Sequence, residues 1–136
     1  MTWIEMNERP FQFTRRLRSF RFALAGIWTV LRSQHNAWVH AAATVVVVAA
    51  GLLLGLSASE WAVLVLAMMA VWAAEALNTA FEFLADVTSP QFHPLVKQAK
   101  DAAAGAVLIA AVGAVVIGLL VLGPHLLDLI RPFGAG

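Results

Sequence analysis

Long stretches of hydrophobic residues dominate this sequence and set its expected architecture. Three of them, at about 37–56, 61–84 and 102–123, are uncharged or nearly so. A helix needs roughly 20 apolar residues to cross the hydrocarbon core of a membrane. We therefore expect an all-α membrane protein with three transmembrane helices, forming a single domain over residues 1–136.

The segment before the first span, about residues 11–33, has a different pattern. Hydrophobic residues recur there at steps of three or four, as on one face of a helix: Phe13, Leu17, Phe20, Leu24, Ile27, Trp28 and Leu31. Arginines lie largely off that face. A basic amphipathic helix beside membrane spans is typical of one lying in the interface. We expect an N-terminal surface helix, the alternative being a soluble helix that packs on a partner.

Composition agrees with a membrane protein and excludes several other classes. The chain is 61% hydrophobic and 12% charged, whereas soluble domains carry about 25% charged residues. Its net charge is +1, and no nucleic-acid-binding motif is present, so we expect no nucleic-acid partner. With no cysteine, disulfides, thiolate metal sites and a cysteine nucleophile are excluded. The first apolar run begins too far from the N-terminus for an ordinary secretory signal.

The distribution of basic residues predicts an orientation. Six of the nine lysines and arginines precede the first span, two lie between the second and third, and only Arg131 falls on the other side. The positive-inside rule places the regions rich in Lys and Arg in the cytoplasm. We therefore expect a cytoplasmic N-terminus, with the 85–101 connection on the same side.

The second hydrophobic run ends in an unusual group of polar residues. At about 100° per residue, Glu75, Asn78, Glu82 and Asp86 fall within about 80° of arc on one helix face. Acids inside a span are costly and usually face a bundle interior or a water-filled site. The alternatives are that Glu75 is protonated or paired and only locks packing, and that Glu82 and Asp86 are simply solvated.

The start of the third hydrophobic run also carries charge. Lys97, Lys100 and Asp101 share a helix face, which read alone is typical of a snorkelling helix start. Together with the acids, they suggest phosphoryl transfer, because carboxylates can hold Mg²⁺ and lysines can neutralise phosphate. Neither GxxxxGK[ST] nor GxGxxG occurs, so a nucleotide would bind without a glycine loop.

Small residues suggest close helix packing. Gly51 and Gly55 form a G-x-x-x-G pattern, and the third run is rich in alanine and glycine. Such patterns favour helix association in membranes. Since three helices shield a polar stripe poorly, an oligomer is a reasonable hypothesis.

Two motifs carry a resemblance to a known family. The motif EALNTAFE (Glu75–Glu82) followed by Asp86, and the motif AKDAAAGAVLIA (Ala99–Ala110), resemble the signature of the prokaryotic diacylglycerol kinase family, which includes undecaprenol kinases. The resemblance covers nearly the whole chain. It implies a homotrimer with shared sites in the bacterial cytoplasmic (inner) membrane, and phosphorylation of a lipid alcohol that depends on ATP and Mg²⁺.

The resemblance also implies roles for individual residues. Glu75 matches the catalytic base, Asn78 the asparagine that accompanies it, and Glu82 a metal ligand. The positions that match the nucleotide site are Arg15, Phe22 near the adenine, Lys100, Asp101, and the loop residues Gln91, Phe92 and His93.

One position departs from the family pattern. The family usually has a second metal-binding glutamate eight residues after a glycine, and counting from Gly26 this chain has Gln34 there. Glutamine offers a carbonyl oxygen but no charge. Ala23 and Ala104 stand where the better-known diacylglycerol kinases carry serines, which favours the undecaprenol kinase branch.

The leading hypothesis is therefore a lipid kinase acting on diacylglycerol or undecaprenol. The first alternative, supported by Gln34, is a catalytically weakened or non-catalytic lipid-binding protein of the same fold. The second alternative is a small transporter with an acid at the membrane midplane.

Overall fold

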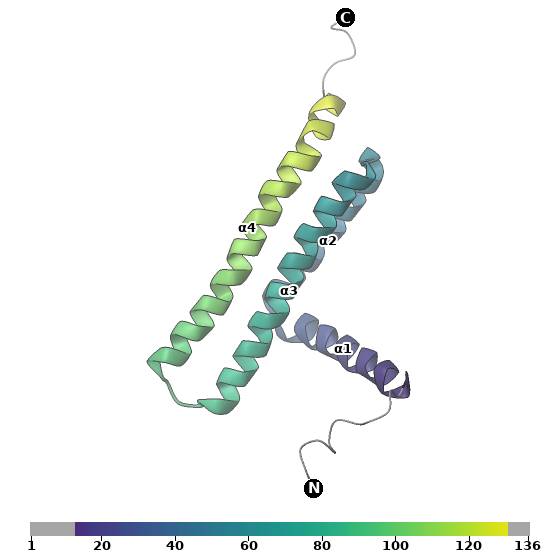
Figure 1. Cartoon of the computed structure of the whole chain (residues 1–136). Coiled ribbons are helices and arrows are strands. Elements are labelled where there is room, and N and C mark those ends of the chain that lie inside the picture. The colour runs from purple at the N-terminus through teal and green to yellow at the C-terminus, as the bar shows by residue number, and fades with distance from the viewer. Residues whose placement is uncertain (1–12, 131–136) are drawn as a thin grey trace, which may run out of the picture.

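The computed structural model describes the backbone of residues 13–130 and the side chains of residues 18–130, and there it contains four α-helices. They are α1 (Phe13–Ser33), α2 (His35–Leu54), α3 (Ala58–Thr88) and α4 (Pro94–Ile130). The three long helices α2, α3 and α4 run side by side and alternate in direction (Figure 1). Helix α1 leaves this bundle sideways at the end where α2 begins.

The prediction of three spanning helices is confirmed in length and composition, since α2, α3 and α4 are each long and apolar enough to cross a membrane. The predicted spans, about 37–56, 61–84 and 102–123, lie within these helices or within two residues of them, and α3 and α4 are longer than their spans. Helix α3 continues to Thr88 and α4 begins at Pro94, so the link between them is residues 89–93 rather than 85–101. Proline suits the first turn of a helix, because its missing N–H would have no intrahelical partner there.

Helix α4 also extends beyond its predicted end at residue 123, through Pro124 to Ile130. An internal proline removes one backbone hydrogen bond, but spanning helices tolerate it where neighbouring groups compensate. Past the proline, His125 Nε2 lies 2.8 Å from Glu60 Oε1 at the start of α3. This contact joins α4 to α3 at the end of the bundle remote from α1.

The turn between α2 and α3 accounts for the glycine pattern within one chain. Gly55 has φ 67° and its N–H bonds to Gly51 O, a left-handed cap that favours glycine. A Cβ on Gly51 would lie 2.8 Å from the Trp61 ring. Ser57 then starts α3 through a reciprocal capping box with Glu60. The two glycines are thus explained by this turn, whatever they also do in assembly.

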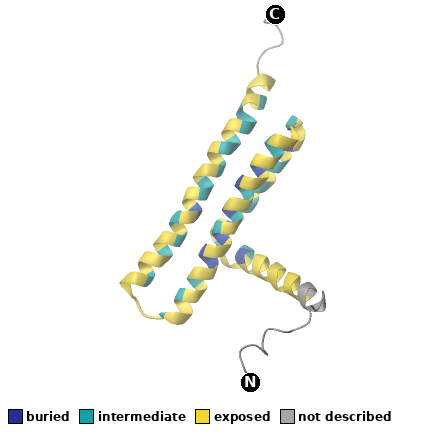
Figure 2. Ribbon diagram, in the orientation of Figure 1, coloured by how far each residue is buried: buried dark blue, intermediate teal, exposed yellow. Residues whose placement is uncertain are grey.

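The core of the chain is small and lies where the three long helices meet (Figure 2). Its apolar part includes Leu64, Ala67, Val71 and Val107. Most large hydrophobic side chains elsewhere on the described helices are exposed, as expected of surfaces that meet lipid tails or other protomers. Towards the α1 end, the buried residues of α3 are polar instead of apolar. The candidate site lies at this polar end.

Candidate active site

The deepest polar residue of α3 is Glu75, which has no exposed surface. Neither of its carboxylate oxygens accepts a hydrogen bond from the described residues. Among the described side chains, the basic group within 4.0 Å of it is His40 on α2, whose Nε2 lies 3.7 Å from Glu75 Oε2. A buried carboxylate without hydrogen bonds is costly and therefore marks a candidate functional site.

One helical turn further along α3, Asn78 and Thr79 are also buried. Thr79 Oγ1 donates to the Glu75 carbonyl oxygen at 2.9 Å, which satisfies its hydroxyl within the helix. Asn78 Nδ2 donates to Glu82 Oε1 at 3.4 Å. The Asn78 carbonyl oxygen Oδ1 has no partner among the described residues, so it is free to accept a hydrogen bond or a cation.

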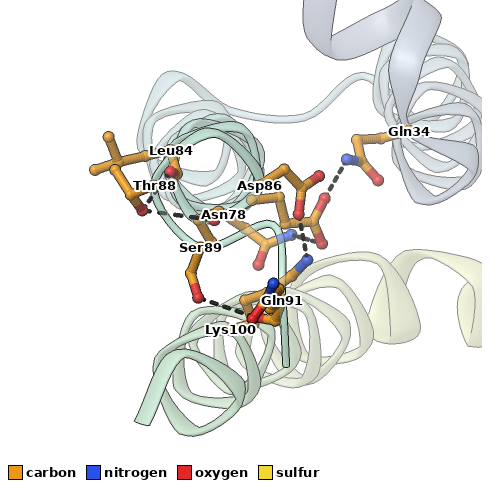
Figure 3. Close-up of polar contacts among 10 residues, drawn as sticks. Gln34, Asn78, Leu84, Asp86, Thr88, Ser89, Gln91 and Lys100 are labelled. Atoms are coloured by element: carbon orange, nitrogen blue, oxygen red, sulfur yellow. Dashed lines mark hydrogen bonds and ion pairs between the residues drawn. The ribbon is translucent and has the colours of Figure 1, made fainter. Parts of the chain in front are cut away.

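Glu82 is half-buried and receives a second hydrogen bond from outside its own helix. Gln34 Nε2 donates to Glu82 Oε2 across the gap between α2 and α3 (Figure 3). Gln34 is the N-cap residue of α2, with an extended backbone (φ −113°, ψ 122°) and no side-chain cap bond. Its side chain is therefore available for Glu82, and Gln34 lies in direct contact with the residue that was expected to bind the metal.

The outer end of the polar stripe meets α4. Lys100 Nζ lies 3.0 Å from Asp86 Oδ1, joining the two helices across the short loop (Figure 3). Lys97 pairs instead with Asp101 within α4. The shared face predicted for these α4 residues is thus divided into two ion pairs, one of which reaches the acidic stripe.

The predicted polar stripe is therefore assembled as a continuous series, from buried Glu75 and Asn78 through half-buried Glu82 to exposed Asp86. Four further residues predicted for the nucleotide site are exposed in the single chain. Phe22 and Phe92 are 66% and 80% exposed, and Gln91 and His93 are also exposed. The side chain of Arg15 lies outside the described residues.

His40 is the residue that sequence reasoning missed. The sequence showed it only as a histidine inside the first hydrophobic run, and its partner in α3 was not predicted. The available signal was a lone ionisable side chain in a span, which by default is a functional candidate. Pairing it with Glu75 required the register between α2 and α3, which helical periodicity does not supply.

The residues around Glu82 suit a hard divalent cation. Among the side chains of residues 18–130 no group of three or more acidic or histidine residues could by itself hold a metal. Mg²⁺, however, is commonly held by only one or two carboxylates together with substrate phosphates. Glu82 supplies one carboxylate. The Asn78 and Gln34 amides lie beside it and turn their nitrogens towards it, so each could offer a neutral oxygen there after its amide rotates. The donor set therefore fits Mg²⁺, with one negative charge fewer than two glutamates would provide.

Comparisons with known proteins agree with this geometry. Residues 21–122 match the family described as Prokaryotic diacylglycerol kinase. The chain is 43% identical to the undecaprenol kinase of Bacillus subtilis (strain 168) over 123 residues, which are 90% of this chain and 100% of that protein. It is 46% identical to the diacylglycerol kinase of Synechocystis sp. (strain ATCC 27184 / PCC 6803 / Kazusa) over 114 residues, 83% of this chain and 65% of that one. This chain belongs to the prokaryotic diacylglycerol kinase family and is a lipid kinase.

Proposed function

We propose that this lipid kinase transfers the γ-phosphoryl group of ATP to the hydroxyl of a membrane lipid alcohol at the cytoplasmic face, with Mg²⁺ as cofactor. The observation that carries the proposal is Glu75, a fully buried carboxylate whose two oxygens have no hydrogen-bond partner among the described residues. The match to an undecaprenol kinase along nearly the whole chain supports a lipid alcohol as acceptor.

Glu75 is proposed as the general base. Phosphoryl transfer requires the acceptor hydroxyl to be oriented and its proton to be removed. Glu75 and Glu82 are seven positions apart on α3, or about 10 Å at 1.5 Å per residue. That spacing places the proposed base, Glu75, deep in the span, where a lipid hydroxyl would lie. It places Glu82 nearer the membrane surface, where the phosphates of a water-soluble nucleotide would bind. Asn78, between them, can orient either group.

Mg²⁺ is proposed to bind at Glu82, with Gln34 and Asn78 as neutral neighbours. In the structure both amides donate to the Glu82 carboxylate. A 180° rotation of the Gln34 amide would turn its carbonyl oxygen towards the same place. When bound, the cation would neutralise charge on the transferring phosphates, while the protein's own contribution is to keep Glu82 in position.

Lys100 and Asp101 on α4 are proposed to contact the nucleotide, together with Arg15, Phe22 and the loop residues Gln91, Phe92 and His93. Lys100 is already held at the acidic stripe by Asp86. Because Phe22 and Phe92 are exposed in one chain, completing the site requires nucleotide binding, a neighbouring protomer, or both. We infer a homotrimer in the bacterial inner membrane, with a cytoplasmic N-terminus and α1 lying at the surface.

The direct test is reconstitution in lipid bilayers with Mg²⁺-ATP and a panel of lipid alcohols, with undecaprenol and diacylglycerol side by side. The proposal expects a phosphorylated product with at least one of them. Thermal unfolding should also shift upward with Mg²⁺-ATP, because a ligand that binds only the folded state stabilises it. Absence of product with every alcohol, and of any shift at millimolar nucleotide, would instead favour a non-catalytic lipid-binding protein.

A further inference from the structure

His40 lies beside the proposed base Glu75 and has no role in the kinase chemistry proposed above. His40 is the one basic side chain within 4.0 Å of the Glu75 carboxylate in the described part of the chain. Their side chains are 15% and 1% exposed. Polar groups this buried normally have hydrogen-bond partners, so a buried carboxylate that has none and lies beside an imidazole calls for an explanation.

His40 also borders a partly open space between the three long helices. It lines a cavity of about 440 Å³ between α2, α3 and α4, whose walls are otherwise almost entirely apolar. Glu75 is not among the residues that line this cavity. His40 therefore stands between the apolar cavity and the buried carboxylate.

The backbone that carries His40 is fixed against α3 by a short chain of hydrogen bonds. Thr44 Oγ1 donates to the His40 carbonyl oxygen at 2.7 Å. Trp72 Nε1 on α3 donates to Thr44 Oγ1 at 3.1 Å. Because Trp72 and Glu75 are one turn apart on α3, this connection holds His40 in register with Glu75.

We propose that His40 is a proton-relay residue, which receives at Nε2 the proton that Glu75 removes from the lipid hydroxyl. This inference rests on the proposed function. As the lipid oxygen bonds to the γ-phosphorus, the bond from that phosphorus to the ADP oxygen breaks, and ADP leaves with the electron pair. The hydroxyl proton passes to the Glu75 carboxylate, then to His40, and finally to water, so one proton is released per transfer. His40 acts through Glu75: by taking the proton, it returns Glu75 to the ionised carboxylate for the next turnover.

Histidine suits this role because it is the side chain that ordinarily changes charge between about pH 5 and 8. No other described side chain packed around His40 is placed to accept the proton from Glu75. On α3, Glu75 faces it and Glu82 lies two turns further on, whereas the α4 part of the cavity wall contributes only apolar residues such as Ala111 and Val115. On α1, the Arg32 guanidinium lies over the Trp28 ring instead.

The test compares the wild type with His40→Gln in bilayers, with Mg²⁺-ATP and either undecaprenol or diacylglycerol, over a range of pH. Glutamine places a nitrogen donor near the position of Nε2 but cannot accept a proton near neutral pH. We expect kcat to fall roughly 10²-fold, at the lower end of what general acid–base catalysis contributes, with little change in KM for ATP or lipid. The acidic limb of the kcat profile should also move.

The chain offers a matched control in its second His–Glu pair, His125 with Glu60 at the opposite end of the bundle. His125→Gln should lower thermal stability and leave the shape of the pH profile unchanged. Added imidazole should restore part of the activity of His40→Ala, which a purely structural role would not allow.

A folded His40→Gln protein with the wild-type kcat and pH profile would overturn the relay while leaving the kinase assignment intact. Failure of imidazole to restore activity to a folded His40→Ala protein would also overturn the relay. A wild type that phosphorylates no lipid alcohol would overturn the proposed function, and the relay with it.

Discussion

Gln34 donates a hydrogen bond to Glu82 across the gap between α2 and α3. The two residues lie 48 positions apart in the chain, at the two positions where the family resemblance implies glutamates. Glutamine here keeps the contact between the helices and removes one negative charge. Without a cation, that exchange relieves the repulsion that two adjacent carboxylates would produce.

Replacing Gln34 by glutamate should therefore strengthen cation binding. The Gln34→Glu variant would place two carboxylates side by side, and we expect the Mg²⁺ concentration for half-maximal activity to fall by roughly tenfold, or about 1.4 kcal/mol. Without Mg²⁺, the same variant should unfold at a lower temperature than the wild type because the carboxylates repel one another. Titrations of activity and of thermal unfolding with Mg²⁺ measure both effects.

Gln98→Glu is the matched control, since it adds the same charge on the exposed surface of α4. It should change neither titration appreciably. Equal behaviour of the two variants would show that Gln34 and Glu82 do not share a cation.

Lys100 should contribute to ATP binding more than to stability. Its ion pair with Asp86 is partly exposed, and such pairs contribute about 0–1 kcal/mol. We expect Lys100→Met to raise the KM for ATP by about tenfold or more, since hydrogen bonds to charged groups contribute roughly 1.5–3 kcal/mol. Thermal unfolding should shift little.

Lys97→Met provides the comparison for Lys100. Because Lys97 pairs with Asp101 within α4 and does not reach Asp86, its loss should raise the KM for ATP by a smaller factor. Steady-state kinetics at saturating lipid measure this difference. An equal rise in the KM for ATP in the two variants would contradict this interpretation.

Gly51 should be required by the turn between α2 and α3. A methyl group there would meet the Trp61 ring at 2.8 Å, and overpacking typically costs about 1–3 kcal/mol. We expect Gly51→Ala to unfold at a lower temperature in detergent. Gly26→Ala is the control, because a methyl group at that position would have no neighbour within 4 Å and alanine favours a helix by about 1 kcal/mol. Equal stability of the two variants would exclude the proposed clash.

Much of the fold can be predicted from the sequence, because a long apolar segment in a membrane must satisfy its backbone hydrogen bonds internally and therefore forms a helix. The helices extend beyond the hydrophobic runs, so hydrophobicity alone does not give their ends. The polar segment from Pro94 to Asp101 is helical throughout, whereas the sequence indicated a helix there only from Lys97 onwards. The proline at its start and the Lys97–Asp101 pair along it both favour a helix, and they are local features outside the apolar run.

The candidate site was predictable in part for the same reason. Helical periodicity placed Glu75, Asn78 and Glu82 on one face, and the structure shows them on one polar stripe. Contacts between helices were not predictable from periodicity, since they depend on register and tilt. The pairing of Glu75 with His40 is the main example, and it changes what can be proposed about the proton.

The central claim is that Glu75 is the base of a lipid kinase. The most direct test is phosphorylation of undecaprenol and diacylglycerol in bilayers with Mg²⁺-ATP, comparing the wild type with Glu75→Gln. Glutamine has nearly the same shape and cannot accept the proton, so we predict a loss in kcat of at least about 10²-fold in a protein that still folds and assembles. A folded Glu75→Gln protein with wild-type turnover would contradict the account.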